Sequence, residues 1–141
     1  ALATALAKSG FIAWIAKLIG TAVAAADMGW VASFVLISLI YIYSHYCFAS
    51  VTARISAMYA AFVAVAAACG VPAMLVAITF GCFANLPISL THYGNGCGPV
   101  YFGAGYVSQG EWWRNGFIIT TINVVIWLTI GMTWWKFIGL Y

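Results

Sequence analysis

Two short polar segments interrupt an otherwise very apolar chain. The first segment, residues 45–54, contains the hydroxyls of Ser50 and Thr52 beside the cation Arg54. The second segment, residues 85–106, contains hydroxyls, an imidazole and two amides among five glycines and two prolines. Neither segment contains Asp or Glu, and a site built from N–H donors, hydroxyls and cations suits an anion better than a metal cation. The sequence offers no paired nucleophile and base, phosphate-binding fingerprint or metal-ligand spacing, so we do not expect an enzyme.

The second polar segment cannot continue as a smooth helix. Glycine loosens the backbone and proline removes a hydrogen-bond donor, so we expect the chain to unwind between Thr91 and Gly98. Unwound backbone at membrane depth is tolerated only where it lines a cavity or is buried in protein, and a broken membrane helix marks a substrate or ion site. The pattern predicts a broken helix over residues 72–107, with Pro72 and Pro99 opening its two halves. The alternative is a loop at the membrane surface.

Two apolar arms flank the first polar segment. As helices, residues 30–46 and 55–68 would span roughly 25 Å and roughly 20 Å, less than the ~30 Å of a hydrocarbon core. The arms could form two ordinary spans or a re-entrant hairpin over residues 29–68, and the small, semi-polar tip favours the hairpin. Ser50 or Thr52 is expected to cap the second arm, because a hydroxyl there can accept a free helical N–H.

Single side chains in the polar segments leave alternatives open. Arg54 would stand in the first turn of the second arm, where the helix dipole disfavours a cation, so we expect an acidic partner or ligand, or a reach to the headgroups. His92 could hydrogen-bond a carboxylate, although a lone histidine of this kind is more often a satisfied structural group. The four cysteines lie far apart in apolar surroundings, where we expect small buried hydrophobes: Cys47, Cys69, Cys82 and Cys97.

The composition places the chain in a membrane. Of its 141 residues, 66% are apolar and 5% are charged, whereas a soluble domain carries roughly 25% charged residues. The sequence therefore predicts an all-α integral membrane protein, and its net charge of +3 is too small and scattered to indicate nucleic-acid binding. The charge-free run 117–135 predicts a last transmembrane helix over residues 117–136. Residues 1–26 predict a helical segment that already begins mid-helix, so we expect that an N-terminal part of the protein is missing.

Motifs in both polar segments resemble those of one transporter family. They are His45-Tyr46-Cys47-Phe48-Ala49-Ser50-Val51-Thr52-Ala53 with Ile55-Ser56-Ala57-Met58, then Leu90-Thr91-His92-Tyr93-Gly94-Asn95-Gly96, the run from Pro99 to Val107, and Trp112-Trp113. In this order they resemble the C-terminal half of the divalent anion:sodium symporter family. Within that family they are similar to the branch of bacterial citrate or tartrate:succinate antiporters and plastid 2-oxoglutarate/malate translocators. The similarity covers nearly the whole chain.

The resemblance implies a fold with two inverted repeats, each with a re-entrant hairpin and a broken helix. It implies that a Ser-Asn-Thr motif at the hairpin tip binds a substrate carboxylate, and the corresponding residues here are Ser50-Val51-Thr52. Because Val51 has no side-chain oxygen for sodium, anion:anion antiport is favoured and sodium-coupled symport is the alternative. The facing wall of the site would come from Thr91, Gly94, Asn95, Gly96 and Pro99.

The resemblance also implies the wider setting of the protein. The expected activity is secondary transport of di- or tricarboxylates by alternating access in a bacterial inner (cytoplasmic) membrane, without a cofactor. The N-terminal repeat, with the other half of the site, is absent from these residues, and the complete protein is expected to be a homodimer. Two alternatives remain open. A passive channel would use the glycine-rich break as a filter, and a non-transporting fragment or membrane subunit would use its apolar surface only for assembly.

Overall fold

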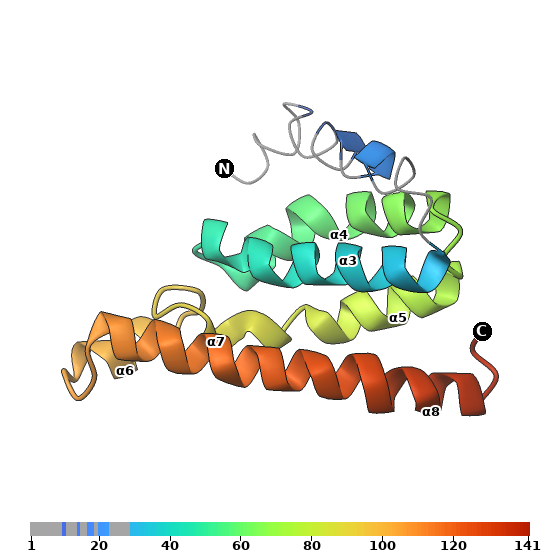
Figure 1. Ribbon diagram of the computed structural model, residues 1–141. Coiled ribbons are helices and arrows are strands. Elements are labelled where there is room, and N and C mark those ends of the chain that lie inside the picture. The colour runs from blue at the N-terminus through green and yellow to red at the C-terminus, as the bar shows by residue number, and fades with distance from the viewer. Residues whose placement is uncertain (1–9, 11–13, 15–16, 19, 23–28) are drawn as a thin grey trace.

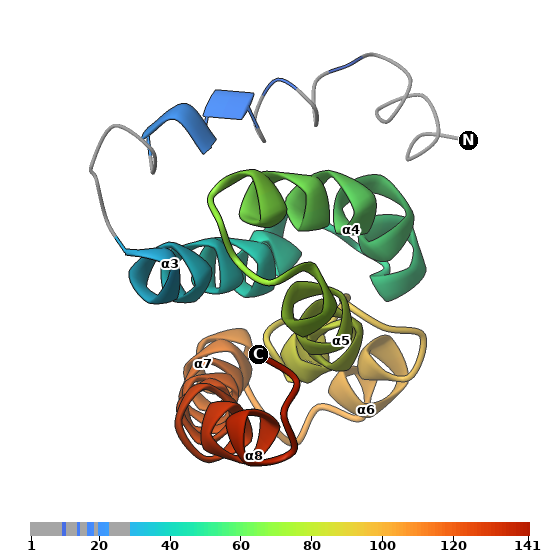
Figure 2. The same cartoon turned by 90° about the vertical axis from the view of Figure 1, so that its right-hand side faces the viewer.

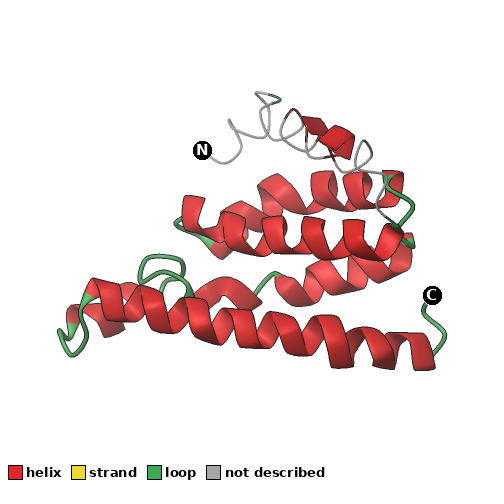
Figure 3. Ribbon diagram, viewed as in Figure 1, coloured by secondary structure: helices red, strands yellow, loops and turns green. Residues whose placement is uncertain are grey.

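Every element of the described part of the chain is helical (Figure 3). The computed structural model describes residues 29–141 together with Gly10, Trp14, Lys17, Leu18 and residues 20–22, so the predicted helical segment 1–26 lies largely outside the described residues. Within the described residues, three helices are long and apolar enough to cross a membrane: Trp30–Cys47, Val51–Ala68 and Gln109–Phe137. The predicted all-α membrane architecture is confirmed, and the chain is a multi-pass integral membrane protein.

Helices α3 (Trp30–Tyr43) and α4 (Val51–Ala68) lie side by side and are joined by a short turn (Figures 1 and 2). A 3₁₀ turn, η1 (Ser44–Cys47), extends α3 towards the connection. Ser50 caps α4, because its hydroxyl accepts a hydrogen bond from the backbone N–H of Ala53 at 3.4 Å. The cap confirms one of the two predicted cap residues. Whether this pair re-enters the membrane stays a prediction.

The chain between Pro72 and Val107 forms three short helical pieces rather than one helix. Helix α5 (Ala73–Phe83) is followed by the 3₁₀ turn η2 (Leu86–Ser89) and, after irregular backbone at 90–97, by α6 (Gly98–Gly103). Helix α5 ends at Phe83, four residues before Pro87. The cause is the proline of η2, which has no N–H and disfavours helical backbone in the residue before it.

The last span runs along the whole length of the bundle (Figure 1). It comprises α7 (Gln109–Ile126), a π-helical turn η3 (Trp127–Gly131) and α8 (Met132–Phe137). Ser108 and Glu111 form a capping box at its start, because the Ser108 N–H donates to Glu111 Oε2 at 2.8 Å and the Ser108 hydroxyl accepts from the Glu111 N–H at 3.4 Å. The charge-free run 117–135 therefore lies inside a longer helix that begins at Gln109.

The core lies where α5 passes between the α3–α4 pair and the last span (Figure 2). Aromatic rings fill it: Tyr41 stacks on Phe80 with ring centres 4.7 Å apart, and Phe62 packs against the same tyrosine at 5.7 Å. Phe34 and Phe83 are also fully buried. The packing holds the two polar segments at the same end of the bundle.

Candidate functional site

The two polar segments meet in a pocket of about 490 Å³. We call its two sides the tip wall, residues 49–52, and the break wall, which consists of Ile88, Tyr93, Asn95, Gly96 and Pro99. Six of the eight predicted site residues line this pocket: Ser50, Val51, Thr52, Asn95, Gly96 and Pro99. The chain therefore brings together hydroxyls and a glycine-rich backbone from segments that are far apart in sequence.

The tip wall presents the beginning of a long helix. Ser50 is the N-cap of α4, Val51 is its first residue, and the Thr52 side chain is exposed. The first N–H groups of a helix have no partner within that helix, and the dipole of an 18-residue helix such as α4 adds partial positive charge there. The tip wall can therefore hold the oxygens of an anion, with the two hydroxyls as further donors.

Asn95 shapes the break wall through its side-chain amide. Its Oδ1 accepts hydrogen bonds from the backbone N–H groups of Cys97 at 2.8 Å and Gly98 at 2.7 Å, and its Nδ2 donates to the carbonyl of Ile88 at 3.1 Å. The amide oxygen is thus already engaged within the turn. Helix α6, which follows, has six residues, so the second helix N-terminus expected here adds little dipole to the pocket.

Thr91 and Gly94 do not line the pocket but lie buried behind the break wall. The Thr91 hydroxyl has no hydrogen-bond partner within the described part of the chain, and neither ring nitrogen of the fully buried His45 has one. A Cβ on Gly94 would overlap His45 Nε2 and lie 2.7 Å from Thr91 Oγ1. These three residues form a close contact between the tip, which comprises residues 45–52, and the break, which comprises residues 88–99.

His92 and Tyr93 hold the break in place from two sides. His92 Nδ1 accepts a hydrogen bond from Trp113 Nε1 at 3.2 Å, and the imidazole stacks on Phe102 with ring centres 4.3 Å apart. His92 thus has the structural role that a lone histidine usually has. The Tyr93 hydroxyl donates to the carbonyl of Tyr46 at 3.0 Å. Sequence reasoning missed Tyr93 as a pocket residue, because its partner lies 47 residues away.

Arg54 corrects both expectations made for it. The side chain is fully buried, so it does not reach the headgroups, and its hydrogen bonds go to backbone carbonyls rather than to a carboxylate. Its guanidinium donates to Tyr41 O at 2.8 Å, Ala84 O at 2.6 Å and Phe83 O at 3.2 Å, and lies 4.6 Å from the centre of the Tyr41 ring. The carbonyls belong to the C-terminal ends of α3 and α5, where the helix dipoles are negative and favour a cation.

The cysteines also differ from expectation. Cys47, Cys82 and Cys97 are exposed and Cys69 is half-buried, and all four are free thiols. Apolar neighbours indicate burial in a soluble protein, but in a membrane chain the apolar residues also cover the outer surface. Within the described ranges, no group of three or more His, Cys, Asp or Glu side chains lies together.

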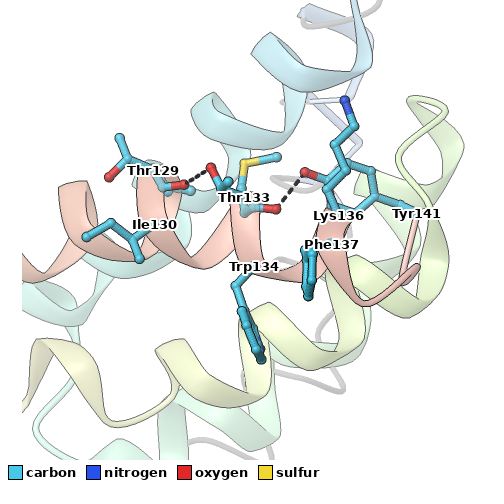
Figure 4. Close-up of a pocket in the computed structure, with 9 residues that line it drawn as sticks. Thr129, Ile130, Thr133, Trp134, Lys136, Phe137 and Tyr141 are labelled. Carbon is cyan, nitrogen blue, oxygen red and sulfur yellow. Dashed lines mark hydrogen bonds between the residues drawn. The ribbon is translucent and has the colours of Figure 1, made fainter.

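A second, larger hollow of about 960 Å³ lies on the last span and contains none of the predicted site residues (Figure 4). Its lining comes from residues 128–141 of a single segment, where the rings of Trp134 and Phe137 point to one side of the helix and Lys136 to the other. The Thr129 and Thr133 hydroxyls donate to carbonyls of their own helix. Because it lacks convergent polar groups from a second element, we do not assign the anion site to it.

Comparison with known proteins identifies relatives of this chain. The profile of the family described as the sodium:sulfate symporter transmembrane region matches residues 1–141. The chain is 45% identical to dicarboxylate transporter 1 of the spinach chloroplast (Spinacia oleracea) and 43% identical to the Arabidopsis thaliana protein of that name, in each case over 100% of the chain and 25% of the relative. It is 36% identical to an inner membrane protein of Escherichia coli (strain K12), over 96% of the chain and 28% of the relative.

The chain spans about a quarter of the length of these relatives. The profile match, by contrast, extends over every residue of the chain. The chain therefore belongs to the family of the sodium:sulfate symporter transmembrane region.

Proposed function

We propose that this chain forms one side of the substrate site of a secondary transporter for di- and tricarboxylates. The observation that carries the proposal is the pocket in which the N-terminus of α4 faces the glycine-rich break. Helix N-termini that face unwound backbone are the usual anion sites of transporters with broken helices. The spinach relative is named a dicarboxylate transporter, which supports this substrate class.

The substrate dicarboxylate binds between the two walls. On the tip wall, the hydroxyls of Ser50 and Thr52 and the first N–H groups of α4 donate to its oxygens, with Val51 supplying only backbone. On the break wall, Gly96 lets the backbone approach the ligand closely, and Pro99 closes the pocket. Thr91 and Gly94 lie behind the break wall and support it without lining the pocket.

The transport mode that the site favours is anion:anion antiport. A sodium site needs oxygen ligands, and Val51 has none in its side chain. The amide oxygen of the opposite wall, Asn95 Oδ1, already accepts hydrogen bonds from two backbone N–H groups. Sodium-coupled symport, named in the family description, is the second candidate. In an exchanger the empty carrier returns slowly, so an outgoing anion drives an incoming one.

Alternating access moves the loaded site across the membrane with a rigid block. We assign residues 29–68 to a re-entrant hairpin, 72–107 to the broken helix and 117–136 to the last transmembrane helix. The chain spans about a quarter of its relatives, so the remaining part of the protein supplies the second hairpin tip and the homodimer contacts. We assign the complete protein to a bacterial inner membrane.

The test is uptake of radiolabelled succinate into proteoliposomes, carried out with this chain and with the longest reading frame that contains it. Vesicles are loaded with unlabelled dicarboxylate or left empty, with and without a sodium gradient. Uptake that needs internal dicarboxylate and ignores sodium establishes the exchanger, and activity confined to the longer protein assigns this chain one side of the site.

The other outcomes separate the alternatives. Uptake into empty vesicles that follows a sodium gradient identifies a symporter. Flux that neither saturates nor responds to internal substrate identifies a channel. Absence of dicarboxylate binding to the longer protein, measured by calorimetry, leaves a membrane subunit and refutes the proposal.

A further inference from the structure

Behind the pocket, the tip and the break approach each other at Gly94. A Cβ built on this glycine would overlap His45 Nε2 and would lie 2.7 Å from Thr91 Oγ1 and 3.2 Å from His45 Cδ2. Carbon atoms do not approach other atoms this closely, so the absence of a side chain is what allows the break to lie this near the tip. His45 is fully buried and belongs to η1, which leads into the tip wall.

A hydrogen bond one residue away draws the same two segments together. The Tyr93 hydroxyl donates to the Tyr46 carbonyl at 3.0 Å, so residues 93 and 94 of the break contact residues 46 and 45 of the tip. The hydrogen bond is attractive, and the contact between Gly94 and His45 limits the approach. Together they fix one separation between the segments.

The last span keeps the break from moving away. A Cβ on Gly116 of α7 would overlap the carbonyl of Ser89, so α7 lies directly against the backbone of η2. The Ser89 and Thr120 hydroxyls are 3.3 Å apart and hydrogen-bonded, and Trp113 Nε1 donates to His92 Nδ1 at 3.2 Å. An atom added at position 94 therefore meets the His45 ring on the side of the tip, while α7 packs against the break on its other side.

We propose that Gly94, through its contact with His45, sets the distance between the tip wall and the break wall and so selects the length of dicarboxylate that fits. Gly94 is a positioning residue, since it lies behind the pocket rather than in its lining. The choice of dicarboxylate as ligand rests on the proposed function, whereas the separation of the walls does not. The two parts are therefore tested by different measurements.

The wall separation is measured with two native cysteines. Cys47 at the tip and Cys97 in the break are exposed free thiols and can carry nitroxide labels once every other cysteine of the full-length protein is replaced. Electron paramagnetic resonance then compares the interlabel distances of the parent, Gly94→Ala and Gly103→Ala proteins. Gly103 is the matched control, because its added Cβ meets nothing within 4 Å. A longer distance in Gly94→Ala alone is expected, and equal distances in all three proteins overturn the proposal.

Substrate choice is measured by uptake of succinate and of 2-oxoglutarate, which is one carbon longer. We expect Gly94→Ala to raise the KM ratio of succinate to 2-oxoglutarate by about tenfold, the effect of losing one hydrogen bond to a charged group. A merely structural defect would lower the maximal rates of both substrates and leave the ratio unchanged, and an unchanged ratio overturns the inference. If the parent protein carries no dicarboxylate, the proposed function fails while the label distances still decide the spacing.

A double variant tests the contact itself. His45→Ala removes the ring that the new methyl group would meet, so Gly94→Ala combined with His45→Ala should restore part of the parent distance and KM ratio. If Gly94→Ala alone does not fold, recovery of folded protein in the double variant supports the same contact. Additive effects, or no recovery, overturn it.

Discussion

Arg54 Nη2 donates to the carbonyl oxygen of Ala84 at 2.6 Å, and so joins the first turn of α4 to the C-terminal end of α5. The same guanidinium also bonds the carbonyls of Tyr41 and Phe83. One buried cation thus donates hydrogen bonds to three carbonyls at the C-terminal ends of α3 and α5. Arg54 lies in the first turn of α4, immediately after the tip wall. This arrangement fixes where α4 begins relative to the rest of the bundle.

Arg54→Ala should destabilise the folded protein by about 2 kcal/mol or more, because it leaves the carbonyls of Phe83 and Ala84 without their side-chain partner and each costs about 1–3 kcal/mol. The Tyr41 carbonyl keeps the Ser44 hydroxyl as a donor. Arg54→Lys keeps the charge but lacks the planar fork, so we expect an intermediate value. Thermal unfolding of the full-length protein in detergent measures both. Arg114→Ala, an exposed change on α7, should shift stability by less than about 0.5 kcal/mol. An Arg54→Ala protein as stable as this control would contradict the role of Arg54.

Thr52→Ala should weaken dicarboxylate binding by roughly 1.5–3 kcal/mol, the value of a hydrogen bond to a charged group. Thr52 is exposed at the start of α4 and lines the pocket, so its loss should not disturb the core. Calorimetric titration of the full-length protein with succinate gives the affinity. Thr133→Ala is the control, since that hydroxyl bonds a carbonyl within the last span at 2.8 Å and lies outside the pocket. Equal affinities for the two variants would remove Thr52 from the site.

Exchange of internal for external dicarboxylate should keep its rate when sodium is replaced by N-methylglucamine on both sides of the vesicle. The physical reason is the shortage of oxygen ligands, since Val51 is apolar and the Asn95 oxygen already accepts from two N–H groups. Loss of exchange in the sodium-free buffer would show that backbone carbonyls form a sodium site without side-chain oxygens.

Asn95→Asp should fold and yet bind dicarboxylate poorly. A carboxylate retains the acceptor for the Cys97 and Gly98 N–H groups and loses only the hydrogen bond from Nδ2 to the Ile88 carbonyl, but it places a negative charge beside the bound anion. Like charges near a protein surface repel by a few kcal/mol at contact distance, so the affinity should fall by about tenfold or more.

Asn115→Asp, an exposed change on α7, adds the same charge away from the pocket and should bind as the parent does. Calorimetry and thermal unfolding should be measured on both variants. If Asn95→Asp binds succinate with the parent affinity, the break wall does not contact the anion.

Local features of the structure followed from the sequence, because their causes lie within a few residues. The Ser50 cap needs a hydroxyl just before a helix, and the end of α4 needs a residue such as Gly70, whose φ is 81°. The interruption after α5 follows from Pro87 and the glycines beyond it. Six of the predicted site residues line one pocket, and the resemblance to a transporter family, rather than a local cause, pointed to them.

Long-range contacts could not be predicted in this way. Arg54 finds its carbonyls 13, 29 and 30 residues away, and Tyr93 finds Tyr46 at a distance of 47 residues. Nothing in a local pattern specifies such partners, because they depend on how α5 and α7 pack. The resemblance places Thr91 and Gly94 in the facing wall of the site, whereas packing places them behind the pocket lining.

The π-helical turn at Trp127–Gly131 changes the register of the last span. Thr120 and Val124 face the core before the turn, and the next buried positions are Met132 and Trp135. In a regular helix of 3.6 residues per turn, the position seven residues after Val124 would share its face, and the turn moves that role to the eighth. The span therefore contains one residue that its inward face does not require. A homologue with a single-residue deletion here would keep the same inward face on an uninterrupted α-helix, so we expect length differences between relatives to occur at this turn.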